Sequence, residues 1–108
     1  MTKKIARDEL KTRLDRGERL VLLEALPEKY YAAGHLPGAR LFPHDQAETL
    51  ATPTIGDKDA EVVVYCASDT CSNSAIAAET LARLGYSRVS VYAGGKKDWE
   101  AAGFPLER

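Results

Sequence analysis

Two stretches of the chain are apolar at nearly every position, without the polar alternation of a half-exposed strand. They are residues 19–25 and 62–65. Such runs are typical of strands that are buried on both faces of a sheet. Three shorter runs, over residues 5–7, 39–42 and 88–92, carry weaker signals of the same kind. The pattern therefore predicts five short strands.

Helical periodicity separates these strands. The expected helices cover residues 9–16, 28–33, 46–50, 76–84 and, beginning at residue 96 or 97, a last segment that ends at 102. Asp8 is expected to cap the first helix, and a loop is expected over residues 51–59. Strands that alternate with helices at this spacing predict an α/β fold, with a mostly parallel sheet and helices on both faces. Ligands are expected outside the carboxyl ends of the strands.

The helix expected over residues 76–84 follows a cysteine-bearing loop. Its apolar stripe consists of Ile76, Ala77, Thr80, Leu81 and Leu84, and Gly85 is expected to end it. The strand over residues 62–65 ends at Cys66, which places a thiol near the amino end of this helix. A helix amino end favours an anion and can lower the pKa of a cysteine from about 8.5. We therefore expect Cys66 to be the reactive residue of an active site, with Ser72, Asn73 and Ser74 as caps of the helix.

Length and charge exclude several classes of function. The 108 residues indicate one domain, residues 1–108, and 15 basic against 16 acidic side chains give a net charge of −1. This balance favours neither a nucleic-acid partner nor a membrane partner. No segment approaches the roughly 18 apolar residues that a membrane-spanning helix needs. We expect a cytoplasmic protein, and we expect a monomer because the sequence has no long apolar stripe that would pack against a partner.

The two cysteines are too few for a disulfide scaffold. His35 and His44 lie far from them in the sequence, so the four residues do not form a zinc-binding spacing. No metal is therefore expected. The placement of Cys66 and Cys71 in one loop indicates reactivity.

Several motifs, taken together, resemble a known family. They are Leu22-Leu23-Glu24, the segment YYAAGHLPGA over residues 30–39, VVVYC at residues 62–66, and YAGG at residues 92–95 followed by Trp99. In this order and spacing they resemble the rhodanese (sulfurtransferase) domains over nearly the whole chain. The resemblance implies a small α/β domain with a central parallel five-stranded sheet. It also implies that Cys66 carries sulfur as a persulfide, inside a loop whose backbone N–H groups surround that sulfur.

The chemistry implied for such a loop is sulfur transfer. The Cys66 thiolate would attack the outer sulfur of a donor such as thiosulfate, a polysulfide or a small persulfide, and a thiol or cyanide would then accept the sulfur. This chemistry needs no organic cofactor, and the partners are thus small molecules. The substrate-binding residues are expected in the loop and at its end: Ala67, Ser68, Asp69, Thr70 and Ser72.

The loop departs from the usual family pattern in its charge. Cys71 stands where the family usually has an arginine, and the loop contains Asp69 but no basic residue. A dianionic donor such as thiosulfate would lack a guanidinium clamp, so we expect weak thiosulfate activity. Lys96 and Lys97 either supply the missing charge or are solvated. Phosphatases of similar architecture are, by resemblance, expected to need a longer loop that is closed by an arginine. Phosphate chemistry is therefore a weaker hypothesis for this loop than sulfur transfer.

Cys71 leaves two interpretations open. It is either a resolving thiol that closes a disulfide with Cys66, if their Cα atoms lie within about 4.4 to 6.8 Å, or a small buried filler. Two further functions stay open for the whole domain: a non-catalytic binding or regulatory module, and a thiol-disulfide redox module.

Residues outside the loop are expected to have structural roles. His35 should make a hydrogen bond that stabilises its turn, and Glu24 should pair with a basic group or with backbone N–H groups at the catalytic edge. Trp99 and Tyr92 are expected in the core. The Gly94-Gly95 pair is expected to permit a sharp turn close to the loop.

Overall fold

The computed structural model describes residues 3–108, and its centre is a sheet of five strands in the order β1-β5-β4-β2-β3. The strands are β1 (Lys3–Lys4), β2 (Val21–Glu24), β3 (Arg40–Leu41), β4 (Val62–Tyr65) and β5 (Val89–Tyr92). Every pairing between them is parallel. The α/β fold with five strands is therefore confirmed, and the sheet is parallel throughout.

The register aligns the carboxyl ends of three strands. Glu24 of β2 pairs with Tyr65 of β4, and Tyr65 pairs with Tyr92 of β5. The residues that follow these strands therefore meet at one edge of the sheet, with β4 in the middle. Cys66 comes directly after β4 and so occupies the centre of that edge.

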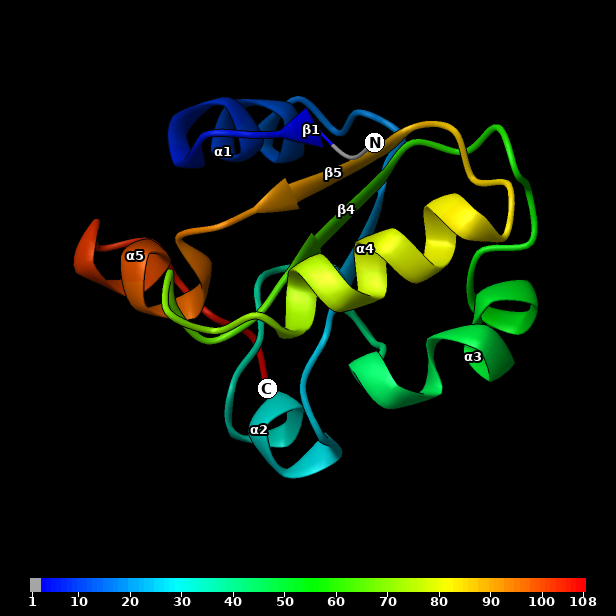
Figure 1. Cartoon of the computed structure of the whole chain (residues 1–108). Coiled ribbons are helices and arrows are strands. Elements are labelled where there is room, and N and C mark those ends of the chain that lie inside the picture. The colour runs from blue at the N-terminus through cyan, green and yellow to red at the C-terminus, as the bar shows by residue number, and fades with distance from the viewer. Residues whose placement is uncertain (1–2) are drawn as a thin grey trace.

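Helices cover both faces of the sheet (Figure 1). They are α1 (Arg7–Asp15), α2 (Glu28–Ala33), the short 3-10 helix η1 (His44–Gln46), α3 (Ala47–Thr54), α4 (Asn73–Arg83) and α5 (Gly95–Ala101). Residues of α3 and α4 share one buried cluster with the sheet, and residues of α1 and α5 share the other. The two clusters are the two halves of the core.

The all-apolar sequence of β4 follows from these two clusters. Val62 and Val64 point into the cluster of α3 and α4, whereas Val63 and Tyr65 point into the cluster of α1 and α5. All four side chains are completely buried. Full burial of such a side chain contributes about 1.5 to 3 kcal/mol, which explains why neither face of this strand is polar. Trp99 is also in the core, as expected.

The amino-terminal elements differ from the expectation by a few residues. Helix α1 begins at Arg7, and Ala6 occupies the N-cap position without a side-chain hydrogen bond. Asp8 is therefore inside the helix, where its carboxylate accepts a hydrogen bond from Arg7 and still favours the positive end of the helix dipole. The first strand is likewise Lys3–Lys4 and not residues 5–7, although the N–H of Ile5 extends the pairing to the carbonyl of Val91.

The prediction was also wrong about α3 and about the exposed face of α4. Helix α3 continues to Thr54 with Pro53 inside it, because Ala47 and Ala51 pack into the core and this packing outweighs the weak local signal. In α4 the buried positions are Ser74, Ala77, Ala78 and Leu81. Ile76 is 43% exposed, so the helix is rotated relative to the predicted stripe.

Candidate active site

Cys66 lies between the end of β4 and the beginning of α4. Its side chain is buried, and its sulfur lies 3.5 Å from Oγ of Ser74, the second residue of α4. The structure thus brings the thiol to the amino end of this helix, as the sequence predicted. Two carbonyl oxygens are also close to the sulfur, at 3.3 Å for Cys71 and 3.9 Å for Ser68, and the thiol can donate to either.

The expected low pKa of Cys66 is not what this environment produces. Burial raises the pKa of the Cys66 thiol above its ordinary value, and the neighbouring thiol of Cys71 raises it further. The hydroxyl and the backbone N–H of Ser74 act in the opposite direction but do not offset the burial. The two carbonyl groups next to the sulfur also favour the neutral thiol, because they can accept a hydrogen bond from S–H and cannot do so from a thiolate. The prediction was wrong because it counted the helix amino end and not the burial.

The loop after Cys66 folds on itself. The N–H of Cys71 donates to the carbonyl of Ser68 at 3.1 Å, and the hydroxyls of Ser68 and Thr70 are 3.0 Å apart. The N–H of Cys71 is thus directed at the carbonyl of Ser68 and not at the sulfur of Cys66. Ser68 and Cys71 are half-buried, whereas the other predicted substrate-binding residues are exposed: Ala67, Asp69, Thr70 and Ser72.

Ser72 does not cap α4 with its side chain, although it occupies the N-cap position. Ser74, predicted as a cap, instead contacts the Cys66 sulfur with its hydroxyl. Sequence reasoning missed this role. The signal was present in the spacing, since Ser74 precedes Ala77, Ala78 and Leu81 by three, four and seven residues and so shares their buried face.

The beginning of α5 packs directly on the backbone of Cys66. The N–H of Lys96 donates to the carbonyl of Cys66 at 3.0 Å, and the N–H of Lys97 donates to that of Ala67 at 2.9 Å. Gly95 has φ +68°, and a Cβ atom there would lie 2.4 Å from the Cys66 carbonyl oxygen. A glycine is therefore required at this position, which confirms the sharp turn expected close to the loop.

A buried ion pair lies behind the same edge of the sheet. Glu24, at the end of β2, is completely buried; its Oε1 accepts a hydrogen bond from the Tyr65 hydroxyl at 2.7 Å. Its Oε2 lies 3.0 Å from Nζ of Lys96, whose side chain is 13% exposed. The expectation that Glu24 pairs with a basic group is confirmed, and Lys96 is not a solvated lysine.

His35 has the structural role predicted for it. Its ring stacks on the ring of Tyr31 with 3.9 Å between centroids, and Nδ1 donates to the carbonyl of Tyr31 at 3.0 Å.

Within residues 3–108 we find no group of three or more His, Cys, Asp or Glu side chains that could hold a metal ion. Over the same residues no helix has the length and the apolar character needed to cross a membrane.

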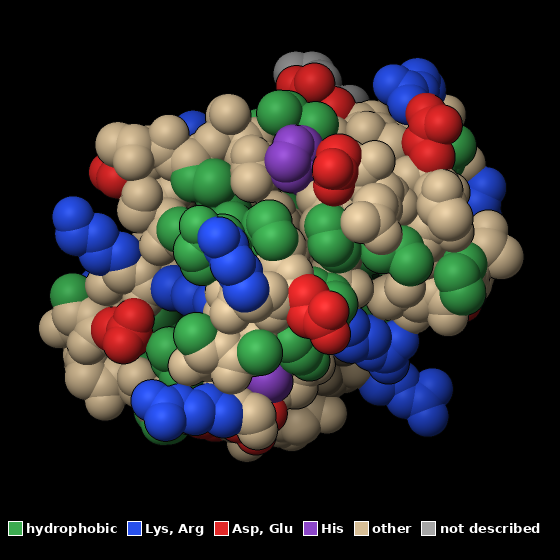
Figure 2. All heavy atoms as spheres, turned by 90° about the horizontal axis from the view of Figure 1, so that it is seen from below, with side chains coloured by type: hydrophobic (Ala, Val, Ile, Leu, Met, Phe, Trp, Pro, Cys, Tyr) green, Lys and Arg blue, Asp and Glu red, His purple; other side chains and the backbone are tan. Residues whose placement is uncertain are grey.

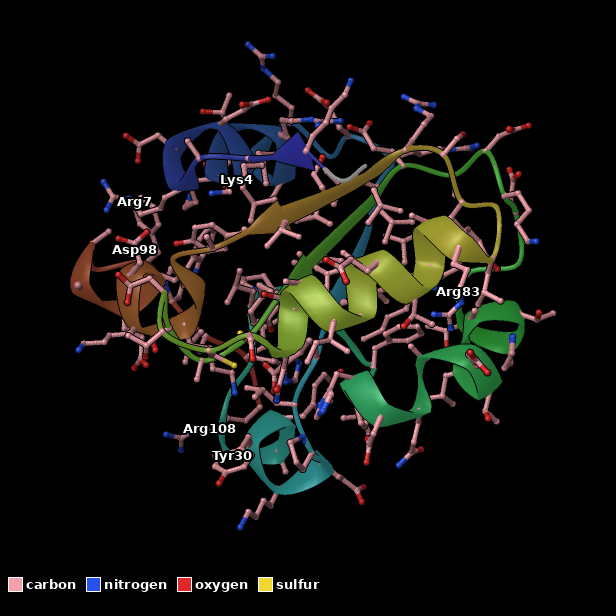
Figure 3. All side chains as sticks on the ribbon, in the orientation of Figure 1. Lys4, Arg7, Tyr30, Arg83, Asp98 and Arg108 are labelled. Atoms are coloured by element: carbon pink, nitrogen blue, oxygen red, sulfur yellow. The ribbon has the colours of Figure 1, made fainter. Side chains whose placement is uncertain are left out.

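Two cavities flank the site. The smaller, of about 290 Å³, lies beside the loop and is lined by Ser68, Asp69 and Lys97, among others. The larger, of about 600 Å³, lies between α2, α5 and the carboxyl-terminal segment; Lys96, Tyr30 and Arg108 line it. Figure 3 shows the Tyr30 and Arg108 side chains close together below α5. On the face where α2 and α3 lie, Figure 2 shows acidic and basic side chains interspersed among apolar ones.

Comparisons with known proteins agree with this architecture. The family model of the rhodanese-like domain matches residues 6–102. An HTH-type transcriptional regulator of Mycobacterium tuberculosis is 36% identical over 104 residues, which are 95% of this chain and 44% of that protein. The chain therefore spans less than half the length of this curated relative.

Solved structures are similar over nearly the whole chain. The crystal structure of a thiosulfate sulfurtransferase from Pseudomonas aeruginosa superposes with a TM-score of 0.87 and 26% identity, over 99% of this chain and 20% of that one. The solution structure of a rhodanese-like domain from an Anabaena protein has a TM-score of 0.87 and 30% identity, over 99% of this chain and 80% of that one.

Proposed function

The chain belongs to the family of rhodanese-like domains, and we propose that it is a sulfurtransferase that carries sulfane sulfur as a persulfide on Cys66. The observation that carries the proposal is the position of this thiol. Cys66 follows the central strand, and its sulfur contacts Ser74 at the amino end of α4. Residues 1–108 act in this proposal as one domain, working as a monomer in the cytoplasm.

The first step forms the persulfide. The Cys66 thiolate attacks the outer sulfur of the donor, a new S–S bond forms, and the S–S bond of the donor breaks. The leaving group is sulfite from thiosulfate, or a thiolate from a persulfide or polysulfide. Because burial raises the pKa of Cys66, the proton must leave before attack, and the hydroxyl and N–H of Ser74 are the groups that stabilise the resulting anion.

The second step returns the thiol. An acceptor thiolate or cyanide attacks the outer sulfur of the persulfide, taking that sulfur as a new persulfide or as thiocyanate and releasing the Cys66 thiolate. The donor and acceptor enter over the exposed part of the loop, which we propose as the substrate-binding surface: Ala67, Asp69, Thr70 and Ser72, with the half-buried Ser68 beside them. Neither step needs a metal ion or an organic cofactor.

The outer sulfur can also leave the Cys66 persulfide by a second reaction, in which Cys71 is the nucleophile. Its thiolate can attack Sγ of the Cys66 persulfide, so that a Cys66–Cys71 disulfide forms and hydrogen sulfide leaves. The sulfane sulfur is reduced and the two thiols are oxidised, so the step needs no further oxidant. Cys71 is half-buried and five residues from Cys66, and both are free thiols in the structure.

A second candidate function is a regulatory module that senses sulfane sulfur or redox state. It is favoured by the similarity to the mycobacterial HTH-type regulator, in which a matching region accounts for 44% of the chain. In this reading the Cys66 persulfide or the Cys66–Cys71 disulfide is a signal and not a turnover intermediate. Catalytic turnover with excess donor and acceptor distinguishes the two, because a sensor changes state once per molecule.

Intact-protein mass spectrometry tests the proposal. After exposure to thiosulfate, to polysulfide or to a small persulfide, the wild-type protein should gain one sulfur, which a thiol reductant removes. The Cys66→Ala variant should gain none, and Cys71→Ser should gain the sulfur but form no intramolecular disulfide. A wild-type protein that stays unmodified with all three donors contradicts the proposal.

A further inference from the structure

Burying the carboxylate of Glu24 has a cost in free energy, so its presence in the interior needs an explanation. A charge transferred from water into a protein interior loses several kcal/mol of hydration, and apolar residues of similar volume often replace a buried ion pair without loss of stability. Glu24 nevertheless is completely buried at the end of β2, paired with Lys96 of α5. The two residues are 72 positions apart, so the pair joins distant parts of the chain.

The contacts of Glu24 converge on the residue before Cys66. The Tyr65 hydroxyl donates to Glu24 at 2.7 Å and accepts the N–H of Leu36 at 3.0 Å. Burial, together with the carboxylate of Glu24, raises the pKa of Tyr65, so this hydroxyl stays protonated and keeps donating. The side chain of Tyr65 is thereby fixed at both of its hydrogen-bonding positions.

The contacts of Lys96 converge on Cys66 itself. Its backbone N–H donates to the Cys66 carbonyl at 3.0 Å, while Nζ donates to the carbonyl of Tyr30 in α2 at 2.7 Å and pairs with Glu24. Lys96 thus ties α2, β2 and the end of β4 together. The glycine before it permits the close approach of α5 to Cys66 that this arrangement needs.

The ion pair lies on the opposite face of the sheet from the Cys66 sulfur. Tyr65 belongs to the core half of α1 and α5, whereas the sulfur faces Ser74 of α4. Glu24 and Lys96 therefore do not touch the reacting atom. They hold the backbone on either side of it.

We propose that the Glu24–Lys96 ion pair is a positioning device, which fixes the Tyr65–Cys66 backbone so that the sulfur stays aligned with the amino end of α4. The inference rests on the proposed sulfur chemistry of Cys66 for its functional meaning. Its structural part, the hold on the Cys66 carbonyl, is measurable without any sulfur donor.

The double variant Glu24→Gln/Lys96→Met gives the sharpest test. It removes both charges at once, so no unpaired charge is left in the interior, and the amide of Gln can still accept from Tyr65. Lys96→Met alone and Lys96→Arg, which keeps the charge, complete the set. Arg83→Met, which breaks an exposed pair with Glu48 at the far end of α4, is the matched control.

Two measurements are made on each folded variant. The first is amide hydrogen exchange at residues 96 and 97, which donate to the carbonyls of Cys66 and Ala67. We expect exchange about tenfold faster there in the double variant, with the amides of β4 unchanged, and near wild-type rates in Lys96→Arg. The second is sulfur transfer, for which kcat should fall about tenfold while KM stays within about twofold. Arg83→Met should change neither.

The outcomes separate this inference from the proposed function. Unchanged exchange at residues 96 and 97 in the folded double variant overturns the positioning role, and so does exchange that accelerates equally across β4, which a purely stabilising pair would cause. A wild-type protein that takes up no sulfur contradicts the proposed function instead, and the exchange measurement still decides whether the ion pair holds Cys66.

Discussion

The carbonyl oxygen of Cys71 lies 3.3 Å from the sulfur of Cys66. This acceptor belongs to the backbone, so it faces the thiol whatever side chain residue 71 carries. An acceptor stabilises the S–H form and disfavours the thiolate. This relationship bears directly on how the reactivity of Cys66 should depend on pH.

The alkylation of Cys66 should rise with pH through the alkaline range. Burial raises the pKa of this thiol, so the thiolate fraction at pH 7 is smaller than in an exposed cysteine, and the midpoint should lie above that of an exposed cysteine. The measurement is the rate of iodoacetamide modification by mass spectrometry, made on Cys71→Ser so that one thiol reports. Ser74→Ala should move the midpoint higher, because it removes a hydroxyl that favours the thiolate. A midpoint below that of an exposed cysteine would show that the helix amino end outweighs burial.

The substitution Cys71→Arg should improve the use of thiosulfate. A guanidinium at this position can pair with the sulfonate oxygens of the donor, and a hydrogen bond to a charged group contributes about 1.5 to 3 kcal/mol, so kcat/KM for thiosulfate should rise about tenfold or more. Steady-state assays with thiosulfate and with a neutral or singly charged polysulfide measure the selectivity. Cys71→Ser is the control, since it removes the thiol without adding charge. Equal gains with both donors would contradict a charge-based explanation.

The substitution Gly95→Ala should destabilise the protein strongly. The added Cβ would meet the Cys66 carbonyl oxygen at 2.4 Å, and φ is +68°. Gly103→Ala is a matched control because φ there is +82° and nothing lies within 4 Å of its Cβ position. Backbone strain should cost both variants about 1 kcal/mol, and Gly95→Ala should lose about 1 to 3 kcal/mol more. Chemical denaturation measures the difference; equal losses would mean that α5 can move away from Cys66 without penalty.

Stability should fall in acid partly through Glu61. The Arg13 guanidinium donates to this carboxylate at 2.6 Å, and holds the pKa of Glu61 below its ordinary value of 4.5. Because the folded pKa is the lower one, the pair stabilises the protein above about pH 4.5, and this contribution is lost as the pH falls further. Arg13→Met should therefore lose about 1 kcal/mol at pH 7 and progressively less below pH 4.

Denaturant titrations over this pH range give the measurement for Glu61. Lys11→Met, which breaks an exposed pair with Asp15, serves as the control and should change little at any pH. A constant difference between Arg13→Met and the wild type from pH 7 to pH 3 would assign the effect to packing of the arginine stem.

The features that the sequence predicted well are those that local patterns determine. The bounds of β4 and α2 agree with the structure residue by residue, because an uninterrupted apolar run and a segment bounded by Pro27 and Gly34 leave little choice. The position of Cys66 followed from the end of β4 alone.

The features that it missed depend on residues distant in sequence or on side-chain surroundings. The partner of Glu24 is 72 residues away, and no local pattern distinguishes Lys96 from Lys97. The direction of the Cys66 pKa depends on how completely the loop covers the sulfur, which the order of residues does not reveal. The same holds for the start of α1, where Ala6 and not Asp8 has the N-cap conformation.

The pairing of β1 with β5 has a consequence for how the chain folds. Lys3 is in register with Ser90, so this contact closes a loop that contains most of the sequence. Contacts of such long sequence separation form late, because the entropy of loop closure must be offset by structure that already exists. We therefore expect β2, β4 and α4 to assemble first. During synthesis β1 therefore stays unpaired until β5 has left the ribosome.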